Sequence, residues 1–91
     1  MTAPFPTFEA FSGCRGDTFE VAGPSGTVAM VLSTVDKWGP GEFTLHFHAP
    51  RESLLPQAIY HFQHADLGAF DIFIVPLGPD EVGMRYEAIF A

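Results

Sequence analysis

The chain of 91 residues has the size of one small domain, because autonomous domains usually span about 50–200 residues. Its hydrophobic content of 47% is typical of compact globular proteins and excludes a largely disordered chain. Four basic against eleven acidic residues give a net charge of −7, which excludes binding to nucleic acids or anionic membranes by charge, since both need clustered Lys and Arg. We therefore expect a single domain over residues 1–91.

Cysteine content and targeting signals narrow the class further. The lone Cys14 can form no internal disulfide and no four-cysteine zinc site. Proline and Glu9 interrupt the first ten residues, so we expect no signal peptide and a cytoplasmic location. The longest apolar run, residues 70–77, includes Asp71 and is far shorter than the roughly 20 residues of a membrane-spanning helix.

The first predicted element is a short helical turn within residues 6–13. Thr7 is a suitable N-cap, Phe8 and Phe11 supply an apolar side, and Gly13 is a suitable end.

After this turn, hydrophobic residues alternate with a period of two, and Gly, Pro or Asp clusters separate the runs. Six strands are predicted, at residues 17–21, 27–35, 42–48, 58–64, 70–76 and 84–90. Short turns between consecutive strands favour antiparallel pairing. The sequence thus predicts an all-β fold: a six-stranded, mainly antiparallel barrel or rolled sheet, with the short N-terminal helical turn plugging or flanking one end.

Alternation also assigns the faces of the strands. Phe43, Leu45 and Phe47 share one side of the third strand, and His46 and His48 share the other. Only the first set gains from burial, so the histidines are expected to point outward. Most of the ten phenylalanines are therefore expected to build the core.

The fifth strand departs from this pattern because both of its faces are apolar. Ile72 and Ile74 occupy one side, whereas Phe73 and Val75 occupy the other. The outer face then needs a cover, either the N-terminal turn with its phenylalanines or a partner subunit. Pro76 is expected to end this strand, since proline cannot donate a hydrogen bond to a ladder.

We favour a non-enzymatic protein-interaction or assembly module without a cofactor, bound to a protein partner or to a second copy. Its interaction surface would comprise Phe73 and Val75, with Trp38 as an exposed anchor at a loop tip. Nucleophilic catalysis would need Cys14 or a serine next to a histidine, and no motif places a base there. Arg15 is expected to lower the pKa of Cys14 somewhat.

The alternative is a small metal- or ligand-binding β-barrel of cupin type, with an enzymatic activity. His46, His48 and Glu52 have the outline of the first metal motif of cupins. In a cupin these histidines point into the barrel, whereas here the opposite face is apolar, and Glu81 stands where the second motif needs a histidine. His64 is better explained by a turn, with Asp66 bonding its own backbone and Gly68 at a positive φ.

Several segments resemble a family of short bacterial proteins that is labelled as a domain of unknown function. They are LPQAIY at 55–60, HADLGAFDIFIVPLGPD at 64–80 and RYEAIF at 85–90, together with FEAF at 8–11 and GDTF at 16–19. The resemblance supplies no catalytic residues. It implies a gene neighbourhood with phage-tail-collar-like proteins, and hence an accessory or assembly role.

Overall fold

The structure is a computed structural model that describes residues 6–90. Its elements are α1 (Phe8–Ser12), β1 (Thr18–Gly23), β2 (Gly26–Gly39), β3 (Glu42–Ala49), β4 (Ala58–His64), β5 (Gly68–Pro79) and β6 (Met84–Phe90). The all-β class and the short N-terminal helix are confirmed. At five residues, α1 is much too short to cross a bilayer, and the described part of the chain contains no other helix.

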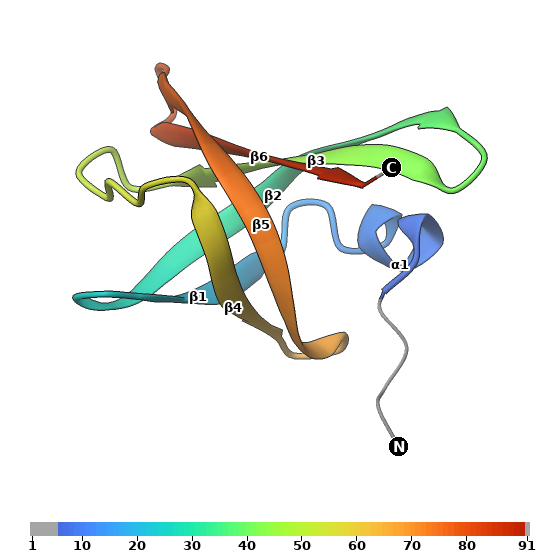
Figure 1. Ribbon diagram of the computed structural model, residues 1–91, viewed down its shortest axis with the longest axis horizontal. Helices are drawn as coiled ribbons and strands as arrows, with labels where there is room; N and C mark the ends of the chain where they lie inside the picture. Colours follow the sequence, from blue (N-terminus) through green and yellow to red (C-terminus); the bar gives the residue numbers. More distant parts are fainter. Residues whose placement is uncertain (1–5, 91) are drawn as a thin grey trace.

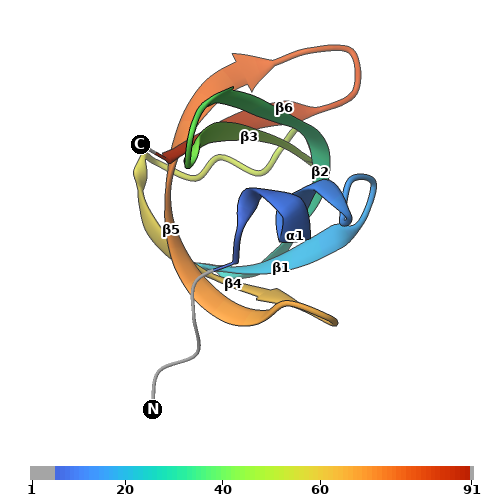
Figure 2. The same ribbon diagram turned by 90° about the vertical axis from the view of Figure 1, so that its right-hand side faces the viewer.

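The six strands form one closed antiparallel barrel in the order β1-β2-β3-β6-β5-β4 (Figures 1 and 2). Pairing between β1 and β4 closes the ring, with Val21 opposite Phe62. Of the two predicted alternatives, the barrel is therefore correct. Closure gives every strand a neighbour on both sides over at least part of its length.

Helix α1 plugs one end of this barrel (Figure 2). The Thr7 hydroxyl accepts a hydrogen bond from the Ala10 N–H at 3.2 Å, as an N-cap should. Phe11 is fully buried, and its ring lies 5.7 Å from that of Phe70 and 5.9 Å from that of Phe90. The N-terminal turn thus enters the core and does not cover the outer face of β5, where Phe73 stays 49% exposed.

Aromatic side chains fill the interior of the barrel. Phe43, Leu45 and Phe47 are buried on β3, as alternation predicts. The rings of Phe19, Phe47 and Phe62 follow one another at centroid distances of 5.3–6.5 Å. The residues nearest the barrel axis therefore form a packed core and not a lumen for a ligand.

Two strands extend by three residues or more beyond their predicted ends. β2 continues to Gly39 because bulges adjust its register against β3, so that Trp38 lies within a strand and not at the predicted loop tip. β5 continues through Pro76 to Pro79. The pairing of β5 with β4 ends at Ile74, so β5 has a neighbour only on its β6 side from there on, and a proline without an N–H is tolerated.

Candidate functional site

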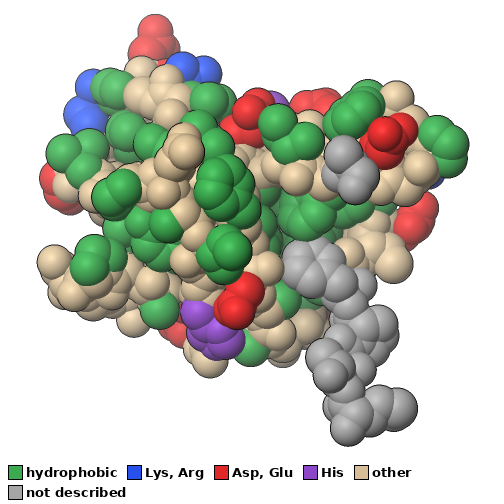
Figure 3. All heavy atoms as spheres, in the orientation of Figure 1, with side chains coloured by type: hydrophobic (Ala, Val, Ile, Leu, Met, Phe, Trp, Pro, Cys, Tyr) green, Lys and Arg blue, Asp and Glu red, His purple; other side chains and the backbone are tan. Residues whose placement is uncertain are grey.

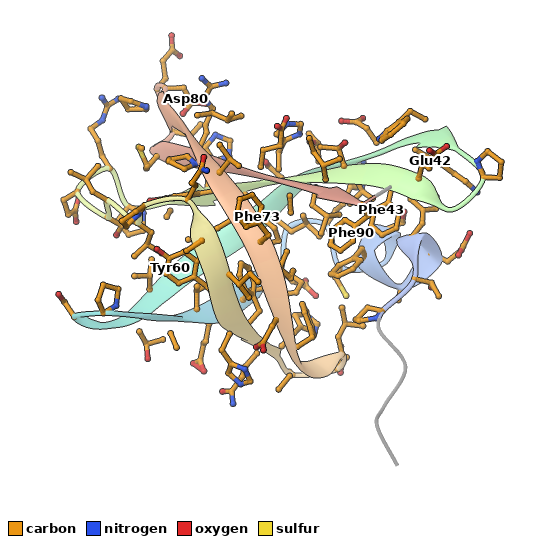
Figure 4. All side chains as sticks on the ribbon, in the orientation of Figure 1. Glu42, Phe43, Tyr60, Phe73, Asp80 and Phe90 are labelled. Atoms are coloured by element: carbon orange, nitrogen blue, oxygen red, sulfur yellow. The ribbon has the colours of Figure 1, made fainter. Side chains whose placement is uncertain are left out.

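The most prominent surface feature is a row of exposed apolar side chains across the barrel wall. We define Ile59 (β4), Phe73 (β5), Ile89 (β6) and Trp38 (β2) as the outer apolar band, with exposed fractions of 68%, 49%, 61% and 54%. Figure 3 shows hydrophobic side chains gathered over the β4–β5 side of the molecule, and Figure 4 shows Phe73 on the ribbon of β5.

Strand register brings these four residues together. Ile59 pairs with Phe73 across β4 and β5. The pairing of β5 with β6 begins at Val75, which lies opposite Glu87, and Phe73 and Ile89 each lie two residues beyond this pair on the outer faces of their strands. Across β6 and β3, Ile89 pairs with Thr44, whose hydroxyl accepts a hydrogen bond from the Trp38 indole N–H at 3.1 Å. The band therefore draws on four strands, β4, β5, β6 and β2, with Thr44 of β3 between Ile89 and Trp38.

The three residues predicted for an interaction surface all have places on this wall. Phe73 is part of the band, half-buried Val75 lies two residues along the same face of β5, and Trp38 lies at the far end. Sequence reasoning missed Ile59 and Ile89. Alternation gives their outward direction, but a single exposed isoleucine on a strand is common, and only the register shows that they extend the surface around Phe73.

Carboxylates and histidines line both sides of the band. His61 Nδ1 lies 2.9 Å from Asp71 Oδ1 on one side. On the other side, His46 Nε2 lies 3.0 Å from Glu87 Oε2, and His46 Nδ1 lies 2.9 Å from Thr34 Oγ1. Both ring nitrogens of His46 therefore have hydrogen-bond partners on the outer wall, and this histidine links β3 to the neighbouring strands β2 and β6.

The cupin-like metal set does not come together. His46 and His48 both lie on the outer face of β3, and His48 Nε2 bonds Asp80 Oδ2 at 2.8 Å. Glu52 is exposed in the loop after β3. Within residues 6–90, the grouping of three potential ligands whose donor atoms lie within 4.8 Å of one another is a different one: Cys14, Asp17 and His64.

This Cys14–Asp17–His64 cluster lies beside the core, with the His64 ring 4.5 Å from the Phe19 ring. His64 Nδ1 accepts hydrogen bonds from the backbone N–H groups of Asp66 and Leu67 at 3.1 and 3.2 Å. The ring hydrogen is therefore on Nε2, which donates to Asp17 Oδ2 at 2.9 Å. A metal at Nε2 would need a lone pair that this tautomer does not offer. The cluster therefore has a structural role: His64 links the turn after β4 to Asp17.

The same contacts correct two expectations. The turn after β4 is capped by the side chain of His64 and not by that of Asp66, whereas Gly68 has the expected positive φ of 81°. Burial, followed by the charges of Asp17 and Asp66, raises the pKa of Cys14, so the predicted lowering by Arg15 is wrong. A thiol with a raised pKa is a poor nucleophile at neutral pH, and His64 has no free ring nitrogen with which to activate it.

A hollow of about 560 Å³ lies on the outer wall between β1, β4 and β5. Short side chains such as Thr18, Ala65 and Ala69 line it, together with Gln63 and Glu20. His64 also lines it, but both ring nitrogens of His64 already have hydrogen-bond partners, so this histidine is not available as a base for a nucleophile there.

A second polar network anchors the turn between β5 and β6. Asp80 Oδ1 accepts hydrogen bonds from the Val82 and Gly83 N–H groups at 2.9 and 3.0 Å, while Oδ2 bonds His48. The His48 hydrogen bond, with the Gly83 and Val82 donors, lowers the pKa of Asp80 from 3.8 to about 2. The ionised carboxylate is therefore the form that this turn favours.

We expect Asp80→Asn to lower the stability of the protein at neutral pH, because the amide cannot replace the charge-assisted bonds. A depressed pKa contributes stability above the ordinary value near 4 and loses it as the pH falls toward 2. The difference in urea midpoint between wild type and Asp80→Asn should thus be full at pH 5–7 and should shrink below pH 4. Glu81→Gln, at the exposed neighbouring residue, is the control and should change the urea midpoint little. If the difference between wild type and Asp80→Asn did not depend on pH, the lowered pKa of Asp80 would be contradicted.

The fold and the site define a class: a small closed antiparallel barrel with a packed aromatic core, a helical plug and an exposed apolar band. The family described as Domain of unknown function (DUF6916) matches residues 6–90. The chain belongs to this family, which agrees with the resemblance to a short domain of unknown function. No curated protein and no solved structure matches the chain.

Proposed function

We propose that this domain is a non-enzymatic protein-interaction module that docks a partner on the outer apolar band. The observation that carries the proposal is the gathering of four large, exposed apolar side chains on one wall: Ile59 pairs with Phe73, and Ile89 and Trp38 both lie beside Thr44. Isolated apolar residues are normal on a protein surface, but several that gather on one wall and are rimmed by polar groups mark an interaction site.

The side chains of the band suit this role. Tryptophan and other large side chains dominate the energetics of protein interfaces when they are desolvated by a partner. The rigid wall of a closed barrel holds them in place, so little conformational entropy is lost on binding. Polar side chains at the borders, such as Asp71 and Glu87, would form the rim around this apolar centre.

The alternative of a metal- or ligand-binding barrel has weaker support. Its proposed ligands His46 and His48 are hydrogen-bonded to Glu87 and Asp80 on the outer wall, and aromatic rings fill the interior. For the partner, the family resemblance suggests a structural protein of a phage-tail-like assembly, in which this domain would be an accessory or assembly factor.

The test is a comparison of proteins captured from the native host by wild type, Phe73→Asp and Val82→Asp. Phe73 is in the band, whereas Val82 is even more exposed, at 76%, but lies in the turn after β5. We expect a partner that wild type and Val82→Asp retain and that Phe73→Asp loses by at least tenfold, since a charge in a desolvated centre is costly. Equal capture by all three would contradict docking on the band, and tail-like structural proteins among the lost partners would support the assembly role.

A further inference from the structure

We infer that the partner of the outer apolar band presents a basic rim, with Lys or Arg side chains around an apolar patch, and is not a second copy of this chain. This inference rests on the proposed function and adds the chemistry of the occupant. It follows from the charges that border the band and from the places of the cations.

Three of the four strands that contribute to the band carry a carboxylate next to it, and so does β3, which lies between β6 and β2. Asp71 lies two residues before Phe73 on the outer face of β5, and its side chain is 65% exposed. Glu87 lies two residues before Ile89 on β6. Asp36 lies two residues before Trp38 on β2, and its side chain is 68% exposed. Glu42 lies two residues before Thr44 on β3. These four carboxylates enclose the band on both sides.

None of the four cations of the chain lies in this border. Lys37 is next to Trp38 in sequence but on the other side of the strand, where its Nζ lies 5.1 Å from the centre of the Phe8 ring. Arg85 bonds the carbonyl groups of Leu77 and Gly78, and Arg51 bonds the carbonyl of Asp80. Arg15 lies in the turn between α1 and β1. Figure 3 shows Asp and Glu side chains close to the hydrophobic surface and most of the visible Lys and Arg atoms at one far corner.

The border disfavours self-association. Two copies joined through their bands would bring two acidic rims together, each in a chain of net charge −7, and close like charges across an interface oppose association. The band lies on the outer face of the sheet and not along a backbone edge, so strand addition would not cover it. The occupant must therefore dock onto side chains, and positive groups at its rim would meet Asp36, Asp71 and Glu87.

Two synthetic 12-residue peptides test this inference directly. They share the same alternating Phe and Leu residues and lack Trp, and they carry either Lys or Glu at the intervening positions. Trp38 is the sole tryptophan and belongs to the band, so its emission reports contact. At about 50 mM salt we expect the Lys peptide to shift the emission to the blue and to bind at least tenfold more tightly than the Glu peptide, with an advantage that falls as salt is added.

Matched variants separate local complementarity from net charge. Asp71→Asn should weaken the Lys peptide severalfold, whereas Glu81→Gln removes one equal charge from an exposed site outside the border and should change little. Phe73→Ser and Ile59→Ser should each lower the affinity for the Lys peptide, with circular dichroism confirming the fold. The side chains of Phe73 and Ile59 are 49% and 68% exposed, so these substitutions leave the buried core unchanged.

The outcomes distinguish this inference from the proposed function. Equal affinity for the two peptides, equal effects of Asp71→Asn and Glu81→Gln, or a concentration-dependent dimer that Phe73→Ser abolishes would overturn the basic rim while leaving the band as a docking surface. Lys-peptide binding that is indifferent to Phe73→Ser and Ile59→Ser would contradict both.

Discussion

Replacing Phe11 with alanine is expected to lower the free energy of unfolding by about 3–5 kcal/mol, the cost of deleting a buried phenylalanine. Phe11 is fully buried and is the residue by which α1 enters the barrel. Its ring lies 6.4 Å or less from the rings of Phe19, Phe43, Phe70 and Phe90. Since small domains are stable by only about 5–15 kcal/mol, the midpoint of urea unfolding should fall steeply.

Phe8→Ala is the matched control within the same helix. Phe8 is half-buried, contacts the Phe43 ring at 5.8 Å and lies under Lys37, so its removal leaves a space that solvent can fill. We expect it to cost clearly less than Phe11→Ala. Equal losses for the two variants, or a loss below about 1 kcal/mol for Phe11→Ala, would show that α1 is an appendage and not a plug.

Much of this architecture is predictable because burial and strand period act locally. The alternation of Phe43, Leu45 and Phe47 with polar residues fixes both the strand and its inward face. The strand ends are less predictable because they depend on neighbours. Pro76 reads locally as the end of β5, yet the absence of a β4 partner beyond Ile74 makes the proline acceptable there.

The outer apolar band was predictable only in part. The two-sided apolar character of β5 predicts that the outer face around Phe73 needs a cover, and within residues 6–90 the Phe73 side chain remains 49% exposed. The contribution of Ile59 and Ile89 depends on how β4 and β6 align with β5 and β3, and this alignment is a property of the closed barrel. This alignment cannot be read from any single segment of the sequence.

His64 shows a different limit. Its sequence context, followed by Asp66 and Gly68, indicates a turn, and the turn is present. The contact with Asp17 joins residues 47 positions apart in sequence, so no local pattern could reveal that the imidazole links the turn to the start of β1. A histidine, a cysteine and an aspartate close together suggest a metal or catalytic site. Whether His64 can serve such a site depends on the direction of its hydrogen bonds, which is known only from the structure.

We therefore expect His64→Ala to lower the free energy of unfolding by about 2–4 kcal/mol, because it removes a buried ring and leaves the Asp66 and Leu67 N–H groups and Asp17 without this partner. His61→Ala is the control: His61 also pairs with a carboxylate, Asp71, but its side chain is 49% exposed, so the loss should be about 0–1 kcal/mol.

The response of the melting temperature to added Zn²⁺ distinguishes a structural role of the Cys14–Asp17–His64 cluster from a metal site. With the hydrogen on Nε2 and both backbone donors on Nδ1, His64 offers no lone pair to an ion beside Cys14 and Asp17. Added Zn²⁺ should then leave the melting temperature of the wild type unchanged, since a ligand stabilises a fold only as far as it binds the native state. A rise of several degrees that His64→Ala abolishes and His61→Ala retains would instead establish a metal site and reverse the tautomer assigned to His64.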